Sequence, residues 1–152
     1  MNSKLIIILV CSYLIAFTIN LIPSIKHPDS ILSIFNLLAS LLFLTALLGS
    51  IKKASYSDTF NKGLKVFLIV GSISGIVVYG FKMVEDAMIN YVILDMIASI
   101  QYPLYLMFTT PLFGVNYLFK INYETFSLLM SALYAIAFIL VMSFKKVDTR
   151  HV

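Results

Sequence analysis

Residues 31–51 read ILSIFNLLASLLFLTALLGSI, and the pair Lys52-Lys53 follows directly. These 21 residues contain no charged side chain. A helix rises about 1.5 Å per residue, so about 20 apolar residues cross the roughly 30 Å hydrocarbon core of a bilayer. The length of the stretch and its basic end are typical of a transmembrane helix, and they indicate that lipid is the solvent of this chain.

Three more stretches have the same character, namely residues 5–22, 64–84 and 126–144. The first and the last of them contain no charge, and the middle one has Lys65 and Lys82 near its ends. Lysine side chains at such positions bury their aliphatic stems and place the ammonium group among the lipid headgroups. The sequence therefore predicts four transmembrane helices.

The composition supports a membrane protein and excludes several other classes. Hydrophobic residues make up 61% of the 152 residues and charged residues 12%, whereas soluble domains have about 45–50% and about 25%. Disordered chains are poor in apolar residues, so that class is excluded too. The net charge of +4 comes mostly from basic residues beside apolar stretches, a placement that sets topology and does not indicate nucleic-acid binding. The one cysteine, Cys11, excludes an intramolecular disulfide and a Cys-x-x-Cys redox site.

The segment before the last predicted span is apolar on average but differs from the others. It contains Asp95, Pro103 and Pro111, and two prolines eight residues apart are difficult to place in a helix that faces lipid. We expect residues 85–125 to form an outer segment, with one or two helices in or near the interface that break at Pro103 and near Pro111. A re-entrant segment and a fifth span over residues 89–119 are the alternatives.

Basic residues favour four spans. With both termini in the cytoplasm, four spans place eight basic residues inside and only Lys26, Lys82 and Lys120 outside. Five spans would give six inside and five outside. Because cytoplasmic loops carry an excess of Lys and Arg, we predict a single all-α membrane domain over residues 1–152, in the plasma or inner membrane, with an uncleaved first span.

Small residues predict where the spans pack. Gly71 and Gly75 lie four residues apart on one face of the third span, and Ser127, Ser131 and Ala135 repeat the spacing in the fourth. Small residues allow helix backbones to approach closely in lipid. We expect these positions to make contacts within the four-helix bundle. A homodimer, or contact with another membrane protein, through Gly71 and Gly75 is the alternative.

Ionisable groups that could carry chemistry are few, and no predicted span has one near its middle. Asp95 lies in the outer segment. If it were buried it could carry a proton or a cation, whereas at the interface it is an ordinary solvated side chain. Glu85 and Asp86 follow Lys82 and indicate a charge cluster at a helix end. Two adjacent carboxylates alone make a poor cation site.

No catalytic motif is present, so we expect neither enzymatic activity nor a cofactor or metal. The chain lacks a glycine-rich phosphate loop and an H-E-x-x-H motif. Asn20 and Asn36, inside predicted spans, are expected to bond to neighbouring helices. The predicted function is that of a small accessory, regulatory or immunity-type membrane protein that acts by helix–helix contact. A small transporter or channel that uses Asp95, or Glu85 and Asp86, is the alternative.

The loop after the second span carries a resemblance to a known family. Lys52-Lys53 is followed by ASYSDTFNKG, which leads into the third span. Tyr56, Thr59, Phe60 and Gly63 in this loop resemble a family of bacterial four-span membrane proteins of unknown function, over about residues 44–74 and in the order of the spans. The resemblance implies four spans with an outer segment before the last, and it assigns no catalytic residue. The chain differs from the family in lacking a glycine pair before the loop.

Overall fold

The computed structural model describes residues 3–54, 58–88 and 92–148, and every regular element in these ranges is helical. The long helices are α1 (Ser3–Ile25), α2 (Ile34–Ala54), α3 (Asp58–Met88) and α7 (Tyr123–Asp148). Between α3 and α7 lie five short elements: α4 (Val92–Ala98), α5 (Gln101–Leu104), the π-helix η1 (Tyr105–Thr109), the 3₁₀-helix η2 (Thr110–Val115) and α6 (Asn116–Phe119).

Four helices are long and apolar enough to cross a membrane, as the sequence predicts. Their apolar parts run over Lys4–Ile25, Ile34–Lys52, Phe60–Glu85 and Tyr123–Ser143. The second helix begins at Ile34, three residues later than predicted, because Ser33 caps it. The Ser33 amide donates to Asn36 Oδ1 at 2.9 Å, which satisfies a backbone donor at the start of the helix in the manner of a capping box.

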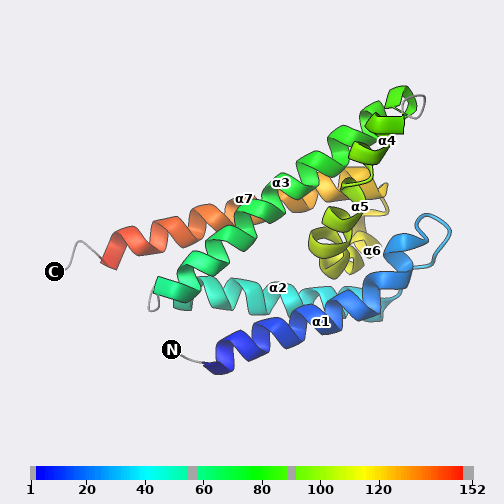
Figure 1. Ribbon diagram of the computed structural model, residues 1–152. Coiled ribbons are helices and arrows are strands. Elements are labelled where there is room, and N and C mark those ends of the chain that lie inside the picture. The colour runs from blue at the N-terminus through cyan, green and yellow to red at the C-terminus, as the bar shows by residue number, and fades with distance from the viewer. Residues whose placement is uncertain (1–2, 55–57, 89–91, 149–152) are drawn as a thin grey trace.

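The long helices form two pairs. Figure 1 shows α1 beside α2 and α3 beside α7, with α5 and α6 in the space where the two pairs diverge. The start of α1, the end of α2, the start of α3 and the end of α7 lie at the same end of the bundle (Figure 1). This arrangement is that of an even number of long helices, and it agrees with the predicted order of the spans.

The contact between α3 and α7 depends on small residues. A Cβ atom on Gly75 would lie 2.1 Å from the carbonyl oxygen of Ser127, and one on Gly71 would lie 2.9 Å from the ring of Tyr134. Ser131 Oγ donates a hydrogen bond to the carbonyl oxygen of Ser72. The two backbones therefore approach closely only because no side chain stands between them. The face of α3 that carries both glycines is occupied within the chain, as expected for a bundle contact.

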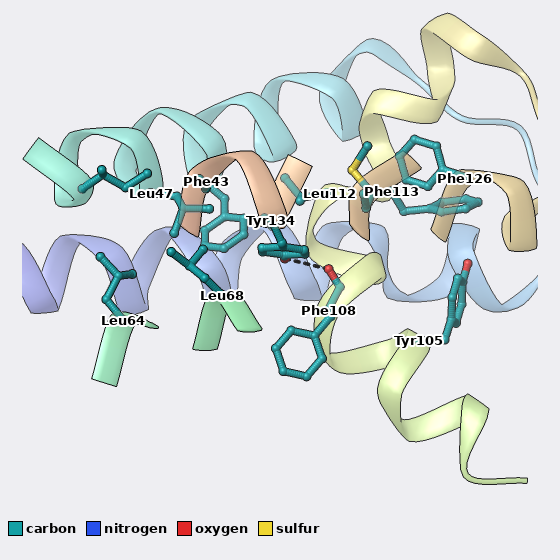
Figure 2. Close-up of a cluster of buried hydrophobic side chains, with 14 of the residues drawn as sticks. Phe43, Leu47, Leu64, Leu68, Tyr105, Phe108, Leu112, Phe113, Phe126 and Tyr134 are labelled. Carbon is teal, nitrogen blue, oxygen red and sulfur yellow. Dashed lines mark hydrogen bonds between the residues drawn. The ribbon is translucent and has the colours of Figure 1, made fainter. Parts of the chain in front are cut away.

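One of the five predicted positions of this contact, Ala135, differs in detail. Ala135 is only half-buried, and its neighbour Tyr134 is the residue that faces Gly71. Tyr134 is fully buried and packs edge-to-face against Phe67 of α3, with ring centroids 5.8 Å apart. Large and small residues thus alternate along this contact, and Figure 2 shows Tyr134 among the buried side chains of the core.

Residues 101–119, which we call the inserted segment, lie between the helices and not across their ends. Tyr105, Phe108, Leu112 and Phe113 of this segment are buried in the core (Figure 2). The apolar side chains of this segment pack between the two helix pairs, an arrangement that fits the re-entrant alternative. The position of residues 85–125 relative to the membrane interface stays a prediction.

The breaks in this part of the chain also differ from those expected. A turn at residues 99–100 separates α4 from α5, whereas Pro103 lies within the first turn of α5. A proline there removes no helical hydrogen bond, because the first amides of a helix have no partner in it. The inserted segment ends at Lys120, whose φ of 51° and ψ of 41° are left-handed, a common way to terminate a helix.

Candidate functional site

Pro111 determines the local shape of the inserted segment. Proline has no amide hydrogen, and its ring conflicts with the carbonyl group four residues earlier in an α-helix, which here belongs to Met107. The helix widens into the π-turn η1 just before this point, where the Thr110 amide bonds to the carbonyl oxygen of Tyr105. It then tightens into the 3₁₀-helix η2. Both irregular turns leave carbonyl groups that need donors from elsewhere.

Two tyrosine hydroxyls supply the first of these donors. Tyr13 Oη donates to the carbonyl oxygen of Met107 at 2.9 Å, and Tyr134 Oη donates to that of Phe108 at 2.8 Å. The bond from Tyr134 is drawn in Figure 2. Tyr13 and Tyr134 lie close to the midpoints of α1 and α7, so the inserted segment reaches about half the height of the bundle at residues 107–108.

A buried group of polar residues, which we call the polar cluster, holds the far side of the segment. Ser40 Oγ donates to the carbonyl oxygen of Pro111 at 2.9 Å and accepts from the amide of Gly114 at 3.0 Å. Asn20 Nδ2 donates to Ser40 Oγ at 3.0 Å, and Asn36 Nδ2 donates to Asn20 Oδ1 at 3.1 Å. Helices α1 and α2 are therefore bonded to each other and to η2 through the same side chains. The prediction that Asn20 and Asn36 find partners on neighbouring helices is confirmed.

Gly114 permits this contact by bringing two backbones together. A Cβ atom at this position would lie 1.8 Å from the carbonyl oxygen of Asn36 and 2.7 Å from Ser40 Oγ. No real side chain tolerates such distances, so the approach of η2 to α2 requires glycine.

Hydrogen bonds made by Tyr105 and Thr110 also tie the inserted segment to Ser24 near the end of α1. Thr110 Oγ1 lies 3.1 Å from Ser24 Oγ, and Tyr105 Oη donates to the carbonyl oxygen of Ser24 at 3.1 Å. On the opposite side, Thr109 Oγ1 donates to Ser127 Oγ of α7 at 3.3 Å. The inserted segment is thus tied to α1, α2 and α7 by bonds that satisfy its irregular backbone and its own hydroxyl groups.

The acidic residues predicted as an ion or proton site are only partly described. Glu85 pairs with Lys82 on the same helix, and Lys82 Nζ lies 5.9 Å from the centre of the Tyr123 ring. For Glu85 the arrangement is the charge cluster expected at a helix end. The side chains of Asp86 and Asp95 lie outside the described residues, so their part in such a site stays a prediction. Among the side chains that the structure does describe, no group of three His, Cys, Asp or Glu could hold a metal ion.

Tyr13, Tyr134 and Gly114 are central to this site and were not singled out in the sequence. A signal for them exists. A proline inside a buried segment frees the carbonyl group four residues before it, and single tyrosines in the middle of otherwise apolar spans are suitable donors for such a group. The sequence does not reveal that these residues lie at the same height.

Comparisons with models of known protein families, with curated protein sequences and with solved structures find no match to this chain. The resemblance of residues 44–74 to a family of bacterial membrane proteins therefore stays a prediction, and the function has to be inferred from the geometry.

Proposed function

We propose that the protein is a multi-pass integral membrane protein, that its two ends lie on the cytoplasmic side, and that residues 101–119 re-enter the membrane. Four long apolar helices support this proposal, as does the apolar surface that they expose. Charge supports the orientation because basic residues gather at the end of the bundle that holds the chain termini. Within the described ranges, the basic residues in the helix ends on that side are Lys4, Lys52, Lys53, Lys62, Lys65, Lys145 and Lys146, against Lys26, Lys82 and Lys120 on the other.

Within the membrane, we propose a non-catalytic role in which the protein acts by contact with another membrane protein, as an accessory or regulatory subunit. The observation that carries this proposal is that the buried polar side chains form hydrogen bonds within the chain. Among the described residues, these side chains bond to the backbone or to one another. The exceptions there are His27 Nδ1, Asn61 Oδ1 and Gln101 Oε1, which are buried without a partner. The polar interior serves the fold, which leaves the outer surface for interaction.

The surface of α1 is the best candidate for that contact. Of the four long helices, α1 is the least covered by the rest of the chain. Ile7, Leu14 and Ile22 are each more than half exposed and lie on its uncovered surface. A partner helix could pack there without displacing any element of the bundle.

Site-specific photo-cross-linking in native membranes tests this role. We expect a cross-linker at Ile7 or Leu14 of α1 to capture one discrete protein. A cross-linker at Ile139 of α7, which is equally exposed, serves as the matched control and should not capture it. Cross-links to lipid alone from all three positions would contradict the proposal.

A transporter or channel is the second candidate, and the broken helix at half height favours it. Transporters place helix breaks at this depth where the irregular backbone lines a cavity. Here, however, the freed carbonyl groups of Met107, Phe108 and Pro111 bond to side chains of the bundle. Flux of protons and cations into proteoliposomes decides between the candidates. Flux that Asp95→Asn or Glu85→Gln abolishes would establish transport, and its absence from the unaltered protein would exclude it.

A further inference from the structure

A pocket with basic residues lies at the end of the bundle away from the chain termini. Its volume is about 310 Å³, and it is lined by the turn that holds His27 and Ser30 and by Asn116, Tyr117 and Lys120 of α6 and its end. No carboxylate is among the lining residues. Asp29 belongs to the same turn but is exposed and does not line the pocket.

The two basic side chains of this pocket have no acidic partner in the described part of the chain. Lys82 and Glu85 of α3 form an ion pair with each other. Lys120 is not part of that pair, and its side chain is exposed. His27 Nδ1 is buried and has no hydrogen-bond partner. The pocket is therefore suited to a group that carries negative charge and accepts hydrogen bonds.

An apolar groove lies on the other side of α6. It has a volume of about 380 Å³ and runs between α2, at Leu44 and Leu48, and α7, from Leu129 to Leu140. The eleven helical steps from Leu129 to Leu140 correspond to a length of roughly 16 Å. Its lining is apolar throughout, and its walls include Ala132 and Leu133.

One turn of helix separates the groove from the basic pocket. Val115 and Phe119 line the groove, whereas Asn116, Tyr117 and Lys120 line the pocket. The four residues of α6 are about 6 Å long. Phe119 and Lys120 are consecutive residues, so the apolar groove and the basic pocket adjoin at the end of α6, at the level where the proposed topology places the headgroups.

We propose that these two spaces together bind one phospholipid with a negatively charged headgroup. Its phosphate lies beside Lys120 and His27, and one acyl chain lies in the groove between α2 and α7. Charge argues for a lipid as the occupant, because the uniformly apolar groove adjoins a pocket that is lined by Lys120 and His27 and contains no carboxylate. This inference goes beyond the proposed contact function and does not depend on the partner protein.

Native mass spectrometry of the purified full chain tests the basic pocket. The protein is incubated in micelles with equal amounts of phosphatidylglycerol and phosphatidylcholine that have the same acyl chains. We expect at least a fivefold preference for phosphatidylglycerol, and we expect Lys120→Asn to reduce it to near equality. Asparagine is chosen because it tolerates the left-handed backbone at this position. Lys26→Asn, at an exposed lysine next to His27 that does not line the pocket, should keep the preference.

A second pair of variants tests the groove. Ala132→Phe places a ring in the groove from its exposed side and should lower retention of both lipids severalfold. Ile139→Phe, on the same helix but outside the groove, should not change retention. Helical circular dichroism establishes that each variant folds, and His27→Gln replaces Lys120→Asn if that variant does not.

Three results would overturn the proposal. The first is equal retention of the two lipids by the unaltered protein. The second is full retention of lipid by Ala132→Phe. The third is thermal stabilisation by glycerol 3-phosphate alone that equals the stabilisation by phosphatidylglycerol, since this would show a site for a free anion and leave the groove without a role.

Discussion

Two of the contacts in this bundle are built by different means. The contact between α3 and α7 joins two regular helices through Gly71, Gly75 and the serines that face them. The contact of the inserted segment with α1 and α2 is a network of hydrogen bonds around Ser40 and Pro111. The first depends mainly on the absence of side chains between two backbones, whereas the second consists largely of hydrogen bonds.

The difference follows from the state of the backbone on each side. A regular helix satisfies its own amide and carbonyl groups, so α3 and α7 need only the absence of bulky side chains to approach each other. The inserted segment is broken at Pro111 and exposes carbonyl groups that its own turns do not satisfy. Its neighbours must then supply donors, because an unbonded carbonyl group in an apolar interior is expensive in free energy. Where the backbone is irregular, polar side chains add hydrogen bonds to the close approach that Gly114 permits.

The largest loss of stability is expected where the inserted segment contacts α2 beside the polar cluster. Gly114→Ala places a methyl group 1.8 Å from the carbonyl oxygen of Asn36. Because hydrogen bonds join η2 to α2 and α2 to α1 here, neither η2 nor α2 can move away without losing bonds. We expect a loss of about 3 kcal/mol in the free energy of unfolding, at the upper end for overpacked positions. Unfolding in mixed micelles measures it. Gly80→Ala is the matched control, since nothing lies within 4 Å of its added methyl group. Equal losses from the two variants would show that the close approach is not needed.

A smaller loss of stability is expected in the contact of α3 with α7. Gly75→Ala places a methyl group 2.1 Å from the carbonyl oxygen of Ser127, but two regular helices can shift apart without losing backbone bonds. We therefore expect a loss of about 1–2 kcal/mol in the free energy of unfolding. Gly49→Ala has open space around it and is the control. A loss larger than that of Gly114→Ala would reverse the ranking of the two contacts.

The smallest effect is expected from single hydroxyl groups. Tyr134→Phe and Tyr13→Phe each remove one bond to the inserted segment and keep the ring. Single interhelical bonds in membrane proteins contribute about 0.6 kcal/mol on average, and we expect each variant to lose about this much stability. Because the two hydroxyls bind adjacent carbonyl groups and both rings contact Phe67, the two losses should not simply add. Faster hydrogen exchange of the amides of residues 108–115 would locate the effect. Thr18→Ala, which removes a bond within α1, should leave that exchange unchanged.

The long helices could be predicted from the sequence because their signal is local. An uncharged apolar stretch that ends in lysine has one physical interpretation, and the helices differ from the predicted spans by a few residues at their ends. The start of α2 was misplaced because Ser33 and Asn36 form the cap, and several earlier residues in that loop are equally good candidates. Gly71 and Gly75 could be identified for the same reason, since a spacing of four residues fixes a common face.

The inserted segment could not be placed from the sequence because its position depends on partners far along the chain. Its apolar residues and prolines fit a helix on the surface as well as one inside the bundle. Its position is fixed by hydrogen bonds from Tyr13, Ser40 and Tyr134. These residues belong to three different helices and contact the segment only in the folded chain. Membrane tyrosines usually prefer the interface, so a tyrosine inside an apolar span is a candidate donor, but the sequence does not identify the carbonyl group that accepts its bond.

The bonds of the inserted segment also set an order for its assembly during synthesis. The donors to Met107 and Pro111, on Tyr13 and Ser40, leave the ribosome before the segment does, whereas Tyr134, the donor to Phe108, leaves after it. We expect the nascent segment to dock first onto the pair of helices already made. The last helix then arrives and closes over a segment that is already anchored on one side. Translation from the N-terminus thus supplies most of the partners before the irregular backbone needs them.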